Sequence, residues 1–204
     1  MKQADKTALT RQKICEAAEA TFSEEGFSAA RVDWIAQRAG VNKQMIYAHF
    51  GSKEGLYDAV LGAVYDRLSS CEEELGHIDV CDGEGVRRTV LVYMRFLMRN
   101  PSFVRLMLWE NLRGAPSAPR AAGPLFRGVR RLLQRGVEQG HLRADLDIEQ
   151  TVLSMNLFCF SAFSNLGTIS RITGQDLATD SALEARAWHI AEVLVRYTAA
   201  EQEV

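Results

Sequence analysis

The sequence has few residues of the kinds that interrupt helices or build strands. Only four of its 204 residues are proline, and three of these, Pro116, Pro119 and Pro124, lie in one short segment. No stretch sustains the alternation of β-branched and polar residues that is typical of β-strands. No apolar run approaches the roughly 20 residues that cross a bilayer, which excludes a membrane anchor. We therefore expect an all-α protein that does not contact a membrane.

Cysteine and net charge are also low. Four cysteines are scattered along a chain long enough to bury a core without disulfides, so we expect free thiols. The polar start, MKQADKTALTRQK, lacks the apolar segment of a secretory signal, and we expect a cytoplasmic protein. The net charge is −2, and residues 1–53 hold eight Lys or Arg against six Asp or Glu. That excess is too small to indicate nucleic acid by itself.

Apolar residues recur at the i, i+3, i+4, i+7 spacing in successive segments, which predicts a series of amphipathic helices. Gly26 and Gly40 mark the ends of the first two, and Asn42 is a good N-cap for the third. The expected helices are 10–25, 32–39, 43–49, 53–70, 84–99, 102–113, 124–139, 147–170 and 181–200. The expected loops are 72–85, 114–124 and 167–180.

Residues 26–56 contain the most informative pattern, two short helices joined by a tight turn that contains glycine. This is the arrangement of a helix-turn-helix. Ala36 and Ala39 on the first helix let the second cross it closely and turn its other face to solvent. The side chains expected on that outer face are Lys43, Gln44 and Tyr47. Such groups hydrogen-bond base edges and phosphates in a DNA major groove.

Within about residues 10–70, the runs G-F, V-x-x-I-A-x-x-A-G-V, I-Y-x-H-F and S-K-E-x-L resemble the DNA-binding domain of the tetracycline-repressor (TetR) family. The resemblance implies an all-helical homodimer with a three-helix DNA-binding head. It also implies a helical body that binds a ligand and dimerises through its last two long helices. We accordingly expect a helix-turn-helix domain at 1–53, a connecting helix at 53–70, and an effector-binding and dimerisation domain at 71–204.

The expected DNA contacts lie on and around the second short helix of the motif. Lys43 and Gln44 are the candidates for base readout, since lysine suits the acceptors of guanine and glutamine the edge of adenine. Tyr47 and His49 match family positions that contact the DNA backbone, and Lys53 opens the next helix, where phosphate is attracted. The full expected set is Arg31, Asn42, Lys43, Gln44, Tyr47, His49 and Lys53. Arg31 stands where the family usually has Ser or Thr, and Asn42 where it often has Ser. The alternative for Lys43 and Gln44 is a solvated helix face, and for His49 a packed or surface histidine.

The body offers apolar side chains for an effector pocket and for a dimer contact, although ordinary core is the alternative for each. The candidate pocket residues are Met94, Phe103, Met107, Trp109, Phe126 and Phe158. Segments 147–170 and 187–197 are apolar on more than one face, so each needs covering on two sides. The candidate interface residues are Phe160, Phe163, Trp188 and Val195.

Other readings of the sequence have less support. Cys71, His77 and Cys81 lie close in sequence, but they do not complete a zinc ligand set, so we expect no metal and no cofactor. A catalytic constellation is also missing, with no nucleophile elbow and no Gly-rich phosphate loop, and we expect no enzyme.

The sequence thus predicts a dimeric repressor that binds a palindromic DNA operator and is released by a small-molecule effector. One alternative is a DNA-binding regulator without a small-molecule effector, controlled by a partner protein or by its own abundance. The other is an enzyme that uses a cavity in the C-terminal body.

Overall fold

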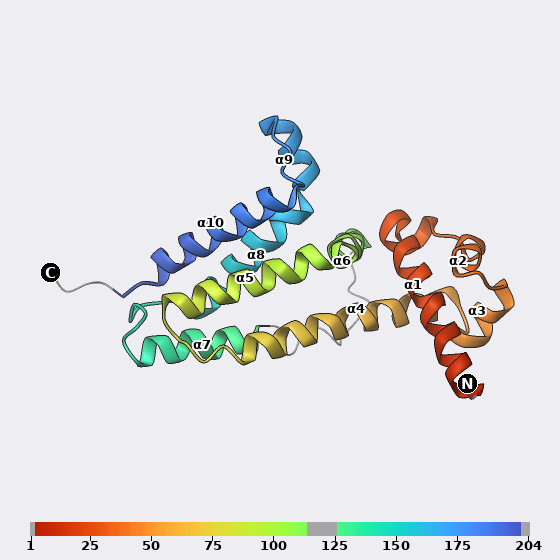
Figure 1. Ribbon diagram of the computed structural model, residues 1–204, viewed down its shortest axis with the longest axis horizontal. Coiled ribbons are helices and arrows are strands. Elements are labelled where there is room, and N and C mark those ends of the chain that lie inside the picture. Colours follow the sequence, from red (N-terminus) through yellow and green to blue (C-terminus); the bar gives the residue numbers. More distant parts are fainter. Residues whose placement is uncertain (1–2, 114–125, 201–204) are drawn as a thin grey trace. The chain divides into compact units, whose positions relative to one another are not determined.

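The computed structural model describes residues 3–113 and 126–200, and its regular elements there are all helices (Figure 1). They are α1 (Gln3–Ala29), α2 (Val32–Ala39), α3 (Lys43–Phe50), α4 (Lys53–Gly76), α5 (Gly83–Arg99), α6 (Pro101–Arg113), α7 (Arg127–Glu138), α8 (Ile148–Ser164), α9 (Leu166–Thr173) and α10 (Asp180–Thr198). The all-α expectation is confirmed. The loop expected at 114–124, with its three prolines, and the first residues of the helix expected at 124–139 lie outside the described residues.

The described helices divide into two compact units. The first contains α1, α2, α3, α4 as far as Arg67, and nearly all of α6. The second contains the last part of α4 together with α5, α7, α8, α9 and α10. The helix at 102–113, which we expected within the body, therefore belongs to the same unit as the helix-turn-helix.

The first unit has one apolar core to which each of its first four helices contributes. Phe22 on α1, Ile35 on α2, Ile46 on α3 and Leu56 on α4 are all completely buried. Because every helix sends a large apolar side chain into the same core, the orientation of α3 is fixed by its inner face. The outer face of α3 is not needed for this core and is exposed.

Helix α1 is longer than its pattern indicates and is kinked at Gly26. It begins at Gln3, and after Gly26 it continues for one more turn to Ala29. Gly26 adopts φ 73° and ψ 169°, a conformation that is essentially confined to glycine. The helix expected at 10–25 is thus correct in type, and Gly26 bends the chain where we expected it to end.

The second unit packs α5 against α10, with α8 in contact with both and α7 against α5 and α8 (Figure 1). Its core comes from one face of each helix and includes Leu97 on α5, Leu132 on α7, Cys159 on α8 and Ile190 on α10. These four side chains are at most 1% exposed, so the unit has a continuous interior of its own.

The helix expected at 147–170 is broken in the structure. The chain bends by 72° between α8 and α9, at Asn165, whose φ and ψ are −109° and 8°. Its apolar residues continue across the break, which is why periodicity alone predicts one helix. Among the described residues no single helix is long and apolar enough to span a membrane, and α8 with α9 meets that test only as a bent pair.

Candidate nucleic-acid interface

The turn between α2 and α3 is held by backbone hydrogen bonds. Gly40 has φ 67°, its N–H donates to the carbonyl of Gln37, and the N–H of Val41 donates to the carbonyl of Ala36. This pair of bonds is a Schellman motif, which satisfies the last carbonyls of α2 and reverses the chain within a few residues. The turn therefore delivers α3 at a fixed angle to α2.

Asn42 begins α3 by capping it. The Asn42 side chain accepts a hydrogen bond of 2.9 Å from the backbone N–H of Met45. One turn later Ile46 is completely buried and anchors the inner face of the helix. The expected N-cap is confirmed, and it orients α3 with Lys43, Gln44 and Tyr47 all exposed.

An acidic residue on α2 connects two of the expected DNA-contacting cations. Asp33 accepts from the Lys43 ammonium at 2.9 Å and lies 3.7 Å from the Arg31 guanidinium. The hydrogen bond from Lys43 lowers the pKa of the Asp33 carboxyl and raises the pKa of the Lys43 ammonium. All three side chains are about half exposed, so water and phosphate can both compete for the cations. Sequence reasoning missed Asp33.

The three remaining expected contact residues have different surroundings. Tyr47 is 42% exposed on the outer face of α3. His49 is half-buried, and its ring lies tilted against Phe50 at the end of the same helix. Lys53 lies with its ammonium 4.7 Å from the centre of the Phe27 ring, and partial burial lowers its pKa. The structure thus brings Tyr47 beside Lys43 and Gln44 on α3, whereas Lys53 leans toward the end of α1.

Helix α6 is fastened to the same unit by a buried polar contact that the sequence pattern does not reveal. Tyr57 of α4 donates a 2.7 Å hydrogen bond to the carboxylate of Glu110, which also pairs with Arg113 at 3.3 Å. Glu110 is only 7% exposed, and a buried carboxylate needs such partners. The Arg113 guanidinium in turn lies 4.4 Å from the Phe27 ring centre. No periodic signal links residues more than 50 positions apart.

The sequence of this chain matches two known protein families, one in its N-terminal part and one in its C-terminal part. The description "Bacterial regulatory proteins, tetR family" matches residues 14–60, which hold the helix-turn-helix. The description "Tetracyclin repressor-like, C-terminal domain" matches residues 83–194, more than half of the chain. The chain belongs to the TetR family of transcriptional regulators. This TetR-family member is therefore a DNA-binding regulator and not an enzyme.

Individual proteins similar to this TetR-family regulator match most of its length. It is 32% identical over 187 residues to the HTH-type transcriptional repressor NicS of Pseudomonas putida, covering 88% of the chain and 86% of NicS. It is 28% identical to the repressor AcnR of Corynebacterium glutamicum, over 71% of the chain and 75% of AcnR. A crystal structure of the transcriptional regulator SCO4942 from Streptomyces coelicolor superposes with a TM-score of 0.71 at 26% identity, over 93% and 98% of the two chains.

The six candidate pocket residues of the regulator are divided between the two units. Phe103, Met107 and Trp109 lie on α6 in the first unit, where Met107 accepts a hydrogen bond from Tyr65 and Trp109 donates to the Ser23 carbonyl. Those in the second unit are Met94, Phe126 and Phe158, of which the first two are buried and Phe158 is 39% exposed. Their role as an effector pocket stays a prediction.

The candidate interface residues all lie on α8 and α10 of the second unit. Phe160, Phe163 and Val195 are partly exposed, and Trp188 is 56% exposed.

All four cysteines are free, as expected, and three of them are buried. In the part of the chain that the structure describes, no three His, Cys, Asp or Glu side chains gather as a metal site would require.

Proposed function

We propose that this TetR-family regulator is a cytoplasmic homodimeric repressor that binds a palindromic operator and is released by a small-molecule effector. The observation that carries the proposal is the presentation of α3. Its inner face is anchored by buried Ile46, and its outer face exposes a cation, an amide and a phenol at its start. A dimer would place two such helices in successive major grooves, about 34 Å apart, on one side of the duplex. Arg31, Asn42 and His49 would contact the backbone around them.

Exposed apolar side chains on α8 and α10 support the dimer. Leu153 and Leu157, one turn apart on α8, are 50% and 62% exposed. Val193 and Tyr197, one turn apart on α10, are 41% and 47% exposed. Helices α8 and α10 pack against each other, so both pairs belong to one unit. Apolar residues gathered in this way usually mark an interaction surface, and a symmetric pair of such faces forms a four-helix contact.

The function is tested by replacing Leu157 with glutamate. We expect wild-type protein to sediment as a dimer and to select inverted repeats from random DNA. Leu157→Glu places a charge in the proposed contact, so it should sediment mostly as a monomer and lose the preference for paired half-sites. Leu112→Glu, the same change at a residue that is 78% exposed in the first unit, is the control. A wild-type monomer, or dimeric Leu157→Glu that still selects inverted repeats, would contradict the proposal.

Asp33 is expected to limit binding to DNA of arbitrary sequence, because it holds the Lys43 ammonium away from phosphate. Asp33→Asn frees Lys43 and removes a negative charge from the binding face. We expect several-fold tighter binding to non-operator DNA, and a plot of log affinity against log salt that steepens by about 0.9, the value for one more neutralised phosphate. Fluorescence anisotropy over a salt series measures both. Glu25→Gln, at an exposed carboxylate on α1, should change neither the affinity nor the slope. An equal effect of Glu25→Gln would show that Asp33 acts only through the net charge of the protein and not through its contact with Lys43.

Release by an effector requires that a ligand favour one arrangement of the protein over another. Helix α4 runs without a break from the first unit into the second, and α6 is joined to the first unit by Glu110 while α5 before it lies in the second. A change in the second unit would therefore reach the DNA-binding unit through two helices. The alternative is a regulator with no small-molecule effector. It would bind operator identically whatever metabolite is added.

A further inference from the structure

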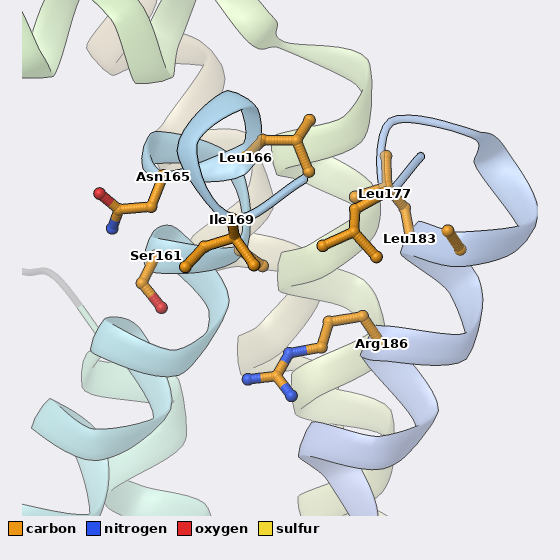
Figure 2. Close-up of a pocket in the computed structure, with 9 residues that line it drawn as sticks. Ser161, Asn165, Leu166, Ile169, Leu177, Leu183 and Arg186 are labelled. Atoms are coloured by element: carbon orange, nitrogen blue, oxygen red, sulfur yellow. The ribbon is translucent and has the colours of Figure 1, made fainter. Parts of the chain in front are cut away.

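The second unit contains a cavity of about 360 Å³ at the corner where α8, α9 and α10 meet (Figure 2). Its volume is at the lower end of the range of small-molecule sites. The break at Asn165 creates it, because α9 turns away from the line of α8 and leaves space above the start of α10. None of the six residues expected to form an effector pocket lines this cavity.

Most of the cavity wall is apolar. Leu166 and Ile169 of α9, Leu177 of the following loop and Leu183 of α10 surround the space in Figure 2. Ile169 remains 42% exposed, and Leu166 and Leu177 are only partly buried. The free energy falls when an apolar group displaces water from apolar side chains that face a space without filling it. The wall thus suits a small hydrocarbon group.

One cation, the exposed Arg186, lines this cavity, and it has no ion-pair partner among the described residues. Figure 2 shows the Arg186 side chain reaching from α10 toward α8, beneath the apolar side chains. Within residues 3–113 and 126–200 its guanidinium makes no hydrogen bond or ion pair. The sequence from 150 to 175, which includes most of α8 and all of α9, has no acidic residue. Positions one turn from Arg186 on α10 are Ala182, Leu183, His189 and Ile190, so no acidic residue lies one turn away on its own helix.

Two further polar side chains line the cavity, on the side opposite Arg186 in Figure 2. Ser161 of α8 and Asn165 at the break both line the cavity. Their hydrogen bonds are local and long, 3.3 Å to the Phe158 carbonyl and 3.3 Å to the Ser164 hydroxyl, so both can turn to a ligand. An arginine fork matches a carboxylate in shape and charge, and the Ser161 hydroxyl and Asn165 amide add polar groups to the same cavity wall.

We propose that this cavity binds a small amphipathic carboxylate, with the carboxylate on Arg186 and the apolar body against Leu166, Ile169 and Leu183. The site goes beyond the proposed function, which leaves the chemistry of the effector open, and rests on it only for the consequence that binding has for DNA release. A second copy of the chain is the rival occupant, because Ser161 and Arg186 adjoin the faces proposed for the dimer.

Calorimetric titration of the full chain with butanoate, hexanoate and octanoate, each compared with its neutral amide, tests the site. We expect at least one carboxylate to bind about tenfold or more tightly than its amide, because a hydrogen bond to a charged group is lost in the amide. Arg186→Gln should weaken that carboxylate about tenfold and leave the amide unchanged. Arg171→Gln, at an exposed arginine of α9 outside the cavity wall, is the matched control and should leave both unchanged.

A second variant tests the wall independently of the charge. Ala182→Phe fills the cavity and should abolish binding of the carboxylate and the amide alike, with circular dichroism showing that the helices remain. Carboxylates that do not bind at millimolar concentration, or that bind Arg186→Gln as tightly as wild type, would overturn the proposal. Operator binding without ligand separates this failure from that of the proposed function. Arg186→Gln should keep it, whereas loss of both operator binding and the dimer would assign Arg186 to the contact between copies and overturn the site.

Discussion

Replacing Lys43 and Gln44 together by alanine should weaken operator binding about a hundredfold. Each well-formed contact to a base edge contributes about 1–3 kcal/mol of discrimination, and the variant removes one cation and one amide from the start of α3. The change should leave the fold intact, because both side chains are exposed and the anchor of α3 is Ile46 on its other face. Gel shift with operator DNA measures the loss, and circular dichroism checks the fold.

The chain supplies a matched control for this variant. Gln12 and Lys13 are the same two residue types, adjacent and exposed on α1 of the same unit. Gln12→Ala with Lys13→Ala removes the same charge and the same amide, and should change operator affinity less than about threefold, the loss of one weak phosphate contact. Undiminished operator affinity in a folded Lys43→Ala/Gln44→Ala protein would refute the assignment of α3 as the recognition helix.

Gly26→Ala should strongly destabilise the DNA-binding unit. At φ 73° and ψ 169° any other residue is strained by about 1–3 kcal/mol. A β-carbon there would also lie 2.8 Å from the ring of Trp109, and overpacking of this kind adds about 1–3 kcal/mol. We expect a fall in Tm on the order of 10 °C, measured by thermal unfolding.

Two comparisons separate strain from collision at Gly26. Gly40 also has a positive φ, 67°, but a β-carbon there meets nothing within 4 Å, so Gly40→Ala should cost only about 1–2 kcal/mol. Adding Trp109→Ala to Gly26→Ala should recover part of the loss, because it removes the collision and leaves the strain. Equal losses in the Gly26 and Gly40 variants would show that Trp109 does not contact this kink.

The DNA-binding motif was predictable because its signals are local. Gly40 closes α2 and Asn42 caps α3 through hydrogen bonds to residues at most five positions away, so the residue types alone specify the turn. The outward direction of Lys43 and Gln44 follows from the spacing of Ile46 on the same short helix. What the spacing could not show is that Asp33, ten positions before Lys43, holds its ammonium.

The C-terminal part was less predictable because its determinants are distant in sequence. The break at Asn165 interrupts an apolar run without a proline, so periodicity carried the expected helix straight through it. The aromatic and methionine residues expected to line one pocket are divided between two units, since hydrophobicity marks a buried residue but not its neighbours. The cavity that does form was missed because it depends on that break.

The sequence by itself determined the helical class, the helix-turn-helix and the family, since capping, turn formation and amphipathic spacing act within a few residues. Only the tertiary structure decided which unit holds α6, which acid pairs with Lys43, and where Arg186 meets an apolar wall. Those outcomes depend on contacts between different helices, which folding makes and which the spacing within one helix does not show. Their packing has no signature in any short window of residues.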